Sequence, residues 1–220
     1  MGLDLFLITA PGKQTKDKLQ SRTDTAIDFF KNTLSKEYTA RELQNVRLVA
    51  MGEKLNGEAN NFDTDAYKIE RRLLEQCIPE KNVVISPHGR DAYTTSALFQ
   101  HTLEGLGKED VGLVGVINDE FYMNRFNKMF NLVYPNTKIL NIGTGVKGNP
   151  VIWSKERILE SAFMFDLKNL YDVDIDKVES MEGHLDIVKA DHPMYAPNNS
   201  EGRWGAYDTI VKARRSFKNP

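Results

Sequence analysis

Five short apolar segments, separated by stretches of helical periodicity, constrain the fold of this 220-residue chain more than any other feature. Each segment is rich in Val, Ile and Leu and almost continuously apolar, as expected for strands that are covered on both faces. The segments span residues 5–9, 47–51, 83–86, 112–117 and 138–142. We therefore predict a parallel sheet of about five strands.

Helical patterns occupy the intervals between these segments, because apolar residues recur there at spacings of three and four. The predicted helices span residues 19–32, 64–76, 92–104 and 120–133. Asp63 precedes the second of them as a candidate N-cap. Strands and helices alternate at the spacing of βαβ units. The fold class that follows is α/β: a three-layer, doubly wound, Rossmann-like parallel sheet.

The strand signal stops after residue 150. We interpret residues 1–150 as the Rossmann-like α/β core and residues 151–220 as a helical C-terminal extension packed on the same domain. The loop at residues 191–204 is either a lid over the core or a surface for a partner. The helices predicted in this extension span residues 155–170, 175–190 and 204–217.

The charge balance and the cysteine content argue against several classes of protein. The chain has 29 basic and 31 acidic residues, so no global field favours nucleic acid or an anionic membrane. No apolar run approaches the roughly 20 residues that span a bilayer, and the N-terminal run is short for a secretory signal. Cys77 is the only cysteine, and we expect it to be a buried small hydrophobe. We therefore expect a cytoplasmic monomer or homodimer with no nucleic-acid or membrane partner.

The loops that leave the predicted strands differ in composition from the loops that enter them. The leaving loops contain most of the loop glycines, a histidine and several polar side chains, whereas the entering loops resemble plain solvated connections. Ligands of open parallel sheets bind beyond the carboxyl ends of the strands, where the strand order reverses. Helix N-termini also converge there and favour an anionic group such as phosphate or carboxylate. We therefore expect a small-molecule site at this edge.

The candidate site residues come from these loops and from the helices beside them. We expect the glycines to allow close backbone approach, and Arg125 and Arg22 to hold an anionic or carboxylate end of the ligand. His88 and Asp91 are candidates for orientation or proton transfer, although Asp91 taken alone is better suited to cap the helix that starts at Ala92. The alternative for Arg125 is to pair with Asp119 or with solvent. No second histidine lies near His88 at metal-ligand spacing, so no metal is expected. The remaining candidates are Gly12, Gly52, Asn118, Gly143 and Gly145.

The stretch Gly143-x-Gly145-x-x-Gly148 has the glycine spacing of a dinucleotide-binding turn. Such a turn follows the first strand of a βαβ unit and opens a helix directly. Here the glycines follow the last predicted strand, and Asn149-Pro150 comes before the next helix. We interpret the stretch as one wall of the site and not as a fingerprint.

The order of these motifs resembles the YdcF/SanA/ElyC-like family, a bacterial family of largely unknown function with a Rossmann-like α/β fold. The resemblance covers roughly residues 3–145. In "ITAPGKQTKDKLQSRTDTAIDFF", Gly12 and Arg22 match the glycine-rich turn and the helix arginine of the family. In "LVAMGEK", Gly52 and Glu53 match the turn after its second strand.

Three further motifs extend the resemblance along the chain. Asp65 stands with Ala66 at the family's Glu-Ala pair, and "HGRDAYTTSA" brings Asp91 and Thr94 into register with its polar ladder. "VGVINDEFYMNRFNKMF" matches the fourth strand and a His-Met-x-Arg turn, with Arg125 at the arginine. Tyr122 replaces the family histidine, so the resemblance assigns no catalytic role at that position.

The resemblance implies a small-molecule ligand, with S-adenosylmethionine as the leading cofactor hypothesis. The chain is most similar to the soluble YdcF branch, for which binding of that cofactor has been proposed. Whether the protein is an enzyme stays open: one alternative is a transferase or hydrolase acting on a phosphorylated or envelope-related substrate. Another alternative is a protein-interaction module that uses the C-terminal helices.

Overall fold

The computed structural model divides the chain into two compact units, Met1–Lys147 and Gly148–Pro220, which are described separately. The predicted packing of a C-terminal extension on the core stays a prediction. Its helices and the loop at 191–204 fall largely or wholly outside the described residues. The residues that the structure describes are 5–9, 16–52, 64–86, 92–108, 111–148, 150, 151, 154, 157, 158, 161, 183 and 184.

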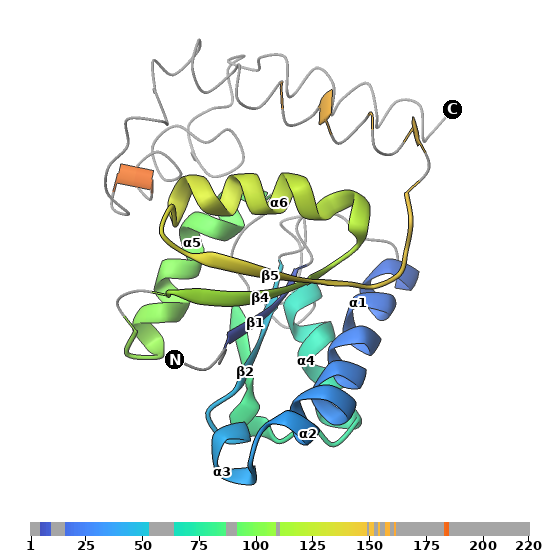
Figure 1. Cartoon of the computed structure of the whole chain (residues 1–220), viewed down its shortest axis with the longest axis vertical. Coiled ribbons are helices and arrows are strands. Elements are labelled where there is room, and N and C mark those ends of the chain that lie inside the picture. Colours follow the sequence, from blue (N-terminus) through green and yellow to red (C-terminus); the bar gives the residue numbers. More distant parts are fainter. Residues whose placement is uncertain are drawn as a thin grey trace. The chain divides into compact units, whose positions relative to one another are not determined.

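Five parallel strands form one sheet in the first unit (Figure 1). The strands are β1 (Leu5–Thr9), β2 (Arg47–Met51), β3 (Val83–Ser86), β4 (Leu113–Asn118) and β5 (Lys138–Gly143). They lie in the order β3-β2-β1-β4-β5, so the direction of travel across the sheet reverses between β1 and β4. The predicted Rossmann-like α/β sheet is confirmed.

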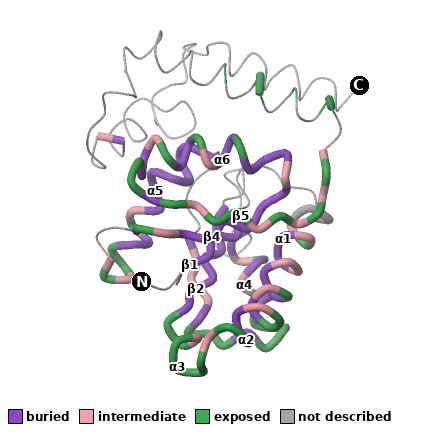
Figure 2. The backbone as a smooth tube through the Cα atoms, in the orientation of Figure 1, coloured by how far each residue is buried: buried purple, intermediate pink, exposed green. Residues whose placement is uncertain are grey.

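Helices cover both faces of this sheet (Figure 1). The longer ones are α1 (Lys16–Asp28), α4 (Asp65–Glu75), α5 (Ala92–Gly105) and α6 (Glu120–Val133). Apolar residues of α1 and α4 form one buried cluster with Phe6, Ile8 and Ile117. Because side chains alternate along a strand, the neighbouring positions point to the other face, where α5 and α6 lie. Figure 2 shows the inner strands buried, whereas the edge strand β5 is mostly exposed or intermediate.

The first predicted helix ends differently from the prediction. Helix α1 continues as a π-helix, η1 (Phe29–Leu34), and then as the short helix α2 (Ser35–Glu37). Phe30 and Leu34 are buried, and the ring of Phe29 lies 5.2 Å from the ring of Phe6. A π-turn is wider than an α-turn, and here it accompanies the burial of these apolar side chains at the end of the helix.

The loop predicted before β2 contains a further helix, α3 (Ala40–Leu43). Its N-cap is Thr39, whose hydroxyl accepts from the Glu42 backbone N–H while the Glu42 carboxylate accepts from the Thr39 backbone N–H. This reciprocal capping box is a T-x-x-E pattern that the sequence displays. Thr64, not Asp63, caps α4, because its hydroxyl accepts from the Tyr67 N–H. The 3₁₀ turn η2 (Glu80–Asn82) leads into β3.

Helix α4 ends in a Schellman motif whose left-handed residue is Cys77, with φ of 61°. The Cys77 N–H donates to Leu74 O at 2.9 Å, and the Ile78 N–H donates to Leu73 O at 3.1 Å. Ile78 and Leu73 are both buried, which completes the apolar contact typical of this motif. The prediction that Cys77 is buried was wrong: the side chain is exposed, because backbone geometry and not packing sets its position.

We expect Cys77→Gly to raise the free energy of unfolding by about 0.5–1 kcal/mol, because glycine adopts the left-handed conformation without a Cβ clash. Cys77→Ala is the matched control, since it removes the thiol and keeps the Cβ. Urea denaturation of both variants measures the difference. Equal stability of the glycine and alanine variants would contradict the assignment.

Gly115 in β4 leaves room for the ring of Phe6 on the neighbouring strand. A Cβ at Gly115 would overlap that ring, whereas a Cβ at Gly112 would have no neighbour within 4 Å. We expect Gly115→Ala to destabilise the protein by about 1–3 kcal/mol through overpacking. Gly112→Ala should be neutral or slightly stabilising, and thermal denaturation compares the two. Similar effects of both substitutions would refute the packing role of Gly115.

Candidate functional site

The point where the strand order reverses is formed by the carboxyl ends of β1 and β4. In open α/β sheets this is the position where ligands bind. Thr9 ends β1, and Asn118 ends β4 directly before Asp119. Thr9, Asn118 and Asp119 are all fully buried.

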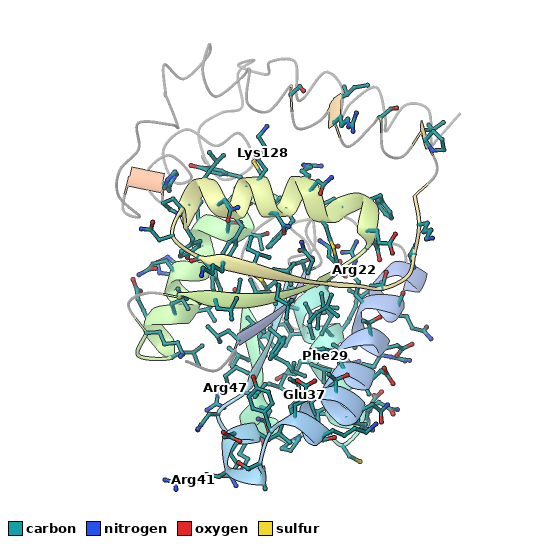
Figure 3. All side chains as sticks on the ribbon, in the orientation of Figure 1. Arg22, Phe29, Glu37, Arg41, Arg47 and Lys128 are labelled. Carbon is teal, nitrogen blue, oxygen red and sulfur yellow. The ribbon has the colours of Figure 1, made fainter. Side chains whose placement is uncertain are left out.

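Arg22 of α1 joins the two strand ends. Its Nη1 donates to the backbone oxygen of Thr9 at 2.6 Å, and its Nη2 donates to Oδ2 of Asp119 at 2.7 Å. The side chains of this ion pair are 1% and 0% exposed, so both charges are removed from water. Figure 3 shows Arg22 at the opposite end of the unit from Arg41 and Arg47, which lie toward the amino ends of the strands.

Asp119 occupies the N-cap position of α6 but its side chain does not cap the helix. An aspartate at this position usually accepts from a backbone N–H of the first turn. Here Oδ2 accepts from Arg22, and Oδ1 accepts from the hydroxyl of Thr144 at 2.8 Å. Thr144 belongs to the loop after β5, and its N–H donates to Asn118 O at 3.2 Å. Asp119 therefore links α1 to the loop that contains Gly145 and Gly148, here called the glycine loop, and does not cap its own helix.

The aromatic ring of Tyr122 lies close to this pair and to a second arginine. The guanidinium carbon of Arg22 is 5.6 Å from the ring centroid, and that of Arg125 is 5.5 Å from it. Both distances are within the range of cation–π attraction. Arg125 is buried as well. The predicted alternative that Arg125 pairs with Asp119 is not what the structure shows: the Asp119 carboxylate accepts from Arg22 and Thr144.

Two of the predicted site residues meet on the other side of β1, at the end of β2. Gly52 has φ of 139°, a conformation that favours glycine. Its N–H donates to Ser86 O, and its own oxygen accepts from the Ala66 N–H, each at 3.3 Å. Asp65 therefore starts α4 beside Gly52, where it is buried and pairs with Lys68 at 3.4 Å.

The other described candidates are distributed around the same edge. Gly143 pairs with Asn118 in register, and Gly145 has φ of 75° in the loop that follows. Thr94 is fully buried in the first turn of α5, which covers the opposite face from α1. The candidates that lie outside the described residues are Gly12, Glu53, His88 and Asp91.

The structure thus brings together Arg22, Asn118 and Gly143 at the strand reversal, and Gly52 and Asp65 at the end of β2. Strand β1 separates the two groups. Sequence reasoning missed the central positions of Thr9, Asp119 and Thr144, although each residue belongs to a strand end or to a loop that leaves a strand. The available signal was the position of Asp119 in "NDE", of Thr144 in "GTG" and of Thr9 at the end of the first apolar run.

Within the described ranges, no group of three or more His, Cys, Asp or Glu side chains could hold a metal ion. Nor does that part of the chain contain a helix with the length and apolarity needed to cross a membrane. The contacts at the strand reversal join arginine, carboxylate, amide and hydroxyl groups.

The fold and this site define a doubly wound α/β protein with a buried polar centre at its strand reversal. Comparisons of the chain with known protein families, with curated proteins and with solved structures found no match. The resemblance to the YdcF/SanA/ElyC-like family therefore stays a proposal.

We expect Arg22→Met alone to destabilise the protein by about 3–5 kcal/mol, because it leaves the carboxylate of Asp119 buried without its partner. The double variant Arg22→Met/Asp119→Asn should be destabilised by about 0.5–3 kcal/mol less than the sum of the two single variants. Urea denaturation of all four proteins completes this double-mutant cycle.

The control cycle uses Arg72 and Asp24, which join α4 to α1 through bonds of 2.8 and 2.6 Å. These side chains are 37% and 46% exposed, so Arg72→Met and Asp24→Asn should show a coupling of at most about 1 kcal/mol. A coupling at the buried pair no larger than at this exposed pair would refute its role in holding the strand ends together.

Proposed function

We propose that this protein binds a small ligand with an anionic end at the carboxyl ends of β1 and β4. The observation that carries the proposal is the buried arginine at the strand reversal. The two terminal nitrogens of Arg22 donate to Thr9 and Asp119, but its buried Nε has no hydrogen-bond acceptor. Buried donors without a partner are rare in folded proteins, so this one suggests a missing acceptor.

The start of α6 supports the same ligand chemistry. Asp119 leaves the first turn of this helix without a side-chain cap, and the N-terminus of a helix favours a negative charge. Arg125 contributes a second buried guanidinium on the ring of Tyr122. A carboxylate or phosphate oxygen on the ligand would complement the Arg22 Nε–H and the positive end of this helix.

S-adenosylmethionine is the leading candidate within this class, because it carries a carboxylate at one end and a nucleoside at the other. We infer a cytoplasmic member of the YdcF-like group that binds this cofactor. The described contacts of Asp119, to Arg22 and Thr144, assign it a structural role and no part in proton transfer. Binding is therefore a better-supported function than proton-transfer catalysis by the described residues.

Isothermal titration calorimetry with S-adenosylmethionine, ATP and NAD tests this proposal. We expect S-adenosylmethionine to bind at micromolar concentrations, and the double variant Arg22→Met/Asp119→Asn to lose most of that affinity. The double variant Arg72→Met/Asp24→Asn changes a second arginine–aspartate pair, which joins α4 to α1, and should bind as the wild type does. If only ATP or NAD binds, that ligand takes the place of S-adenosylmethionine in the proposal, and the proposed site stands. The absence of heat with all three ligands at high micromolar concentration would overturn the proposal.

A further inference from the structure

We propose that Asn118 and Thr9 form a second, uncharged half of the ligand site, on the face of the sheet that α5 and α6 cover. This inference rests on the proposed function and specifies which part of the ligand each face receives. The ligand straddles the strand reversal, with its anionic end on the α1 side at Arg22. Its neutral end presents a hydrogen-bond acceptor beside a donor, as an aminopurine edge does, to Asn118 and Thr9.

The last residues of the five strands form one row across the sheet. The strand register pairs Met51 with Ser86, Thr9 with Met51 and Asn118 with Gly143. Ile8 pairs with Ile117, so the next residues, Thr9 and Asn118, are neighbours across the strand reversal. Ile8 and Ile117 belong to the cluster that α1 and α4 cover. Alternation therefore turns Thr9 and Asn118 to the opposite face.

Both of these side chains carry polar atoms without a partner. No hydrogen-bonding group meets Thr9 Oγ1 or Asn118 Nδ2, although both residues are 0% exposed. The orientation of the Asn118 amide is set by its other end, because Oδ1 accepts from the Asp119 N–H at 2.8 Å. A flipped amide would place two N–H donors against each other, so Nδ2 is the amide atom that has no partner.

Among the described residues, five further buried side-chain atoms lack a partner: Arg22 Nε, Thr95 Oγ1, Gln100 Oε1, Asn127 Oδ1 and the Tyr134 hydroxyl. Apolar packing explains the burial of the Tyr134 hydroxyl, because its ring stacks on Phe130 and contacts Phe99. Of the seven atoms, only Thr9 Oγ1 and Asn118 Nδ2 belong to the last residues of strands. Thr9 and Asn118 contribute little apolar surface, and each buried unpartnered polar group costs about 1–3 kcal/mol. Two such costs on neighbouring strands, at the position where ligands of this fold bind, point to a ligand that satisfies both groups.

The chemistry of the two side chains defines the group that fits them. The Asn118 Nδ2 only donates, so the ligand needs an acceptor such as a ring nitrogen or a carbonyl oxygen. The Thr9 hydroxyl both donates and accepts, so it tolerates an amino group beside that acceptor. A site that hydrogen-bonds a buried ligand group strongly rejects analogues without that group, because its own polar atoms then stay unpaired.

The test uses adenosine, the uncharged part that S-adenosylmethionine, ATP and NAD share, together with whichever of the three binds the wild type. Asn118→Asp keeps the acceptor for the Asp119 N–H and removes both donors. Thr9→Val removes the hydroxyl at almost constant shape and should not lower stability. We expect each variant to weaken both the whole ligand and adenosine by about tenfold or more, as measured by calorimetry.

Thr137→Val is the matched control, because Thr137 is buried at the amino end of β5 and its hydroxyl donates to Val111 O at 2.5 Å. This variant should lose stability and keep its affinity, the reverse of Thr9→Val. The double variant Arg22→Met/Asp119→Asn should weaken the whole ligand much more than adenosine. Wild-type binding with unchanged affinities in Thr9→Val and Asn118→Asp would overturn this inference alone. A wild type that binds none of the ligands would overturn the proposed function, and this inference with it.

Discussion

The buried ion pair between Arg22 and Asp119 is the interaction on which the carboxyl edge of this sheet depends. It joins α1 to the ends of β1 and β4, at the place where the strand order of the doubly wound sheet reverses. Such a pair rarely adds stability compared with apolar packing, because desolvation of both charges offsets their attraction. The pair instead holds other groups in place, because Asp119 also accepts from the Thr144 hydroxyl at the start of the glycine loop.

The sheet could be predicted from sequence because its physical signal is local. Buried parallel strands are continuous apolar runs, and Leu5–Thr9 and Arg47–Met51 begin and end where those runs do. The amphipathic helices could be predicted equally well, since Met123 and Phe126 recur at helical spacing and are buried in α6. The short helix α3 was missed although Thr39 and Glu42 spell its capping box, because the surrounding residues are polar and exposed.

The centre of the site could not be predicted in the same way, because its contacts are not local. Arg22 and Asp119 are 97 positions apart, and an aspartate before a helix reads as an ordinary N-cap. Only the geometry shows that this carboxylate turns away from its helix. The exposure of Cys77 has a similar origin, since a left-handed backbone at the end of α4 leaves no trace in the hydrophobic pattern.

The two faces of the strand reversal divide the chemistry between them. On the α1 side the donors are charged, and an arginine with one unpartnered nitrogen favours an anion. On the α5 and α6 side the groups are neutral, and an amide beside a hydroxyl favours directional hydrogen bonds over charge. A ligand that is anionic at one end and a neutral heterocycle at the other satisfies both sets of groups. Inorganic phosphate or a free nucleobase satisfies only one set. The glycine that ends β5 matters in this arrangement because Gly143, beside Asn118, adds no side chain to the row.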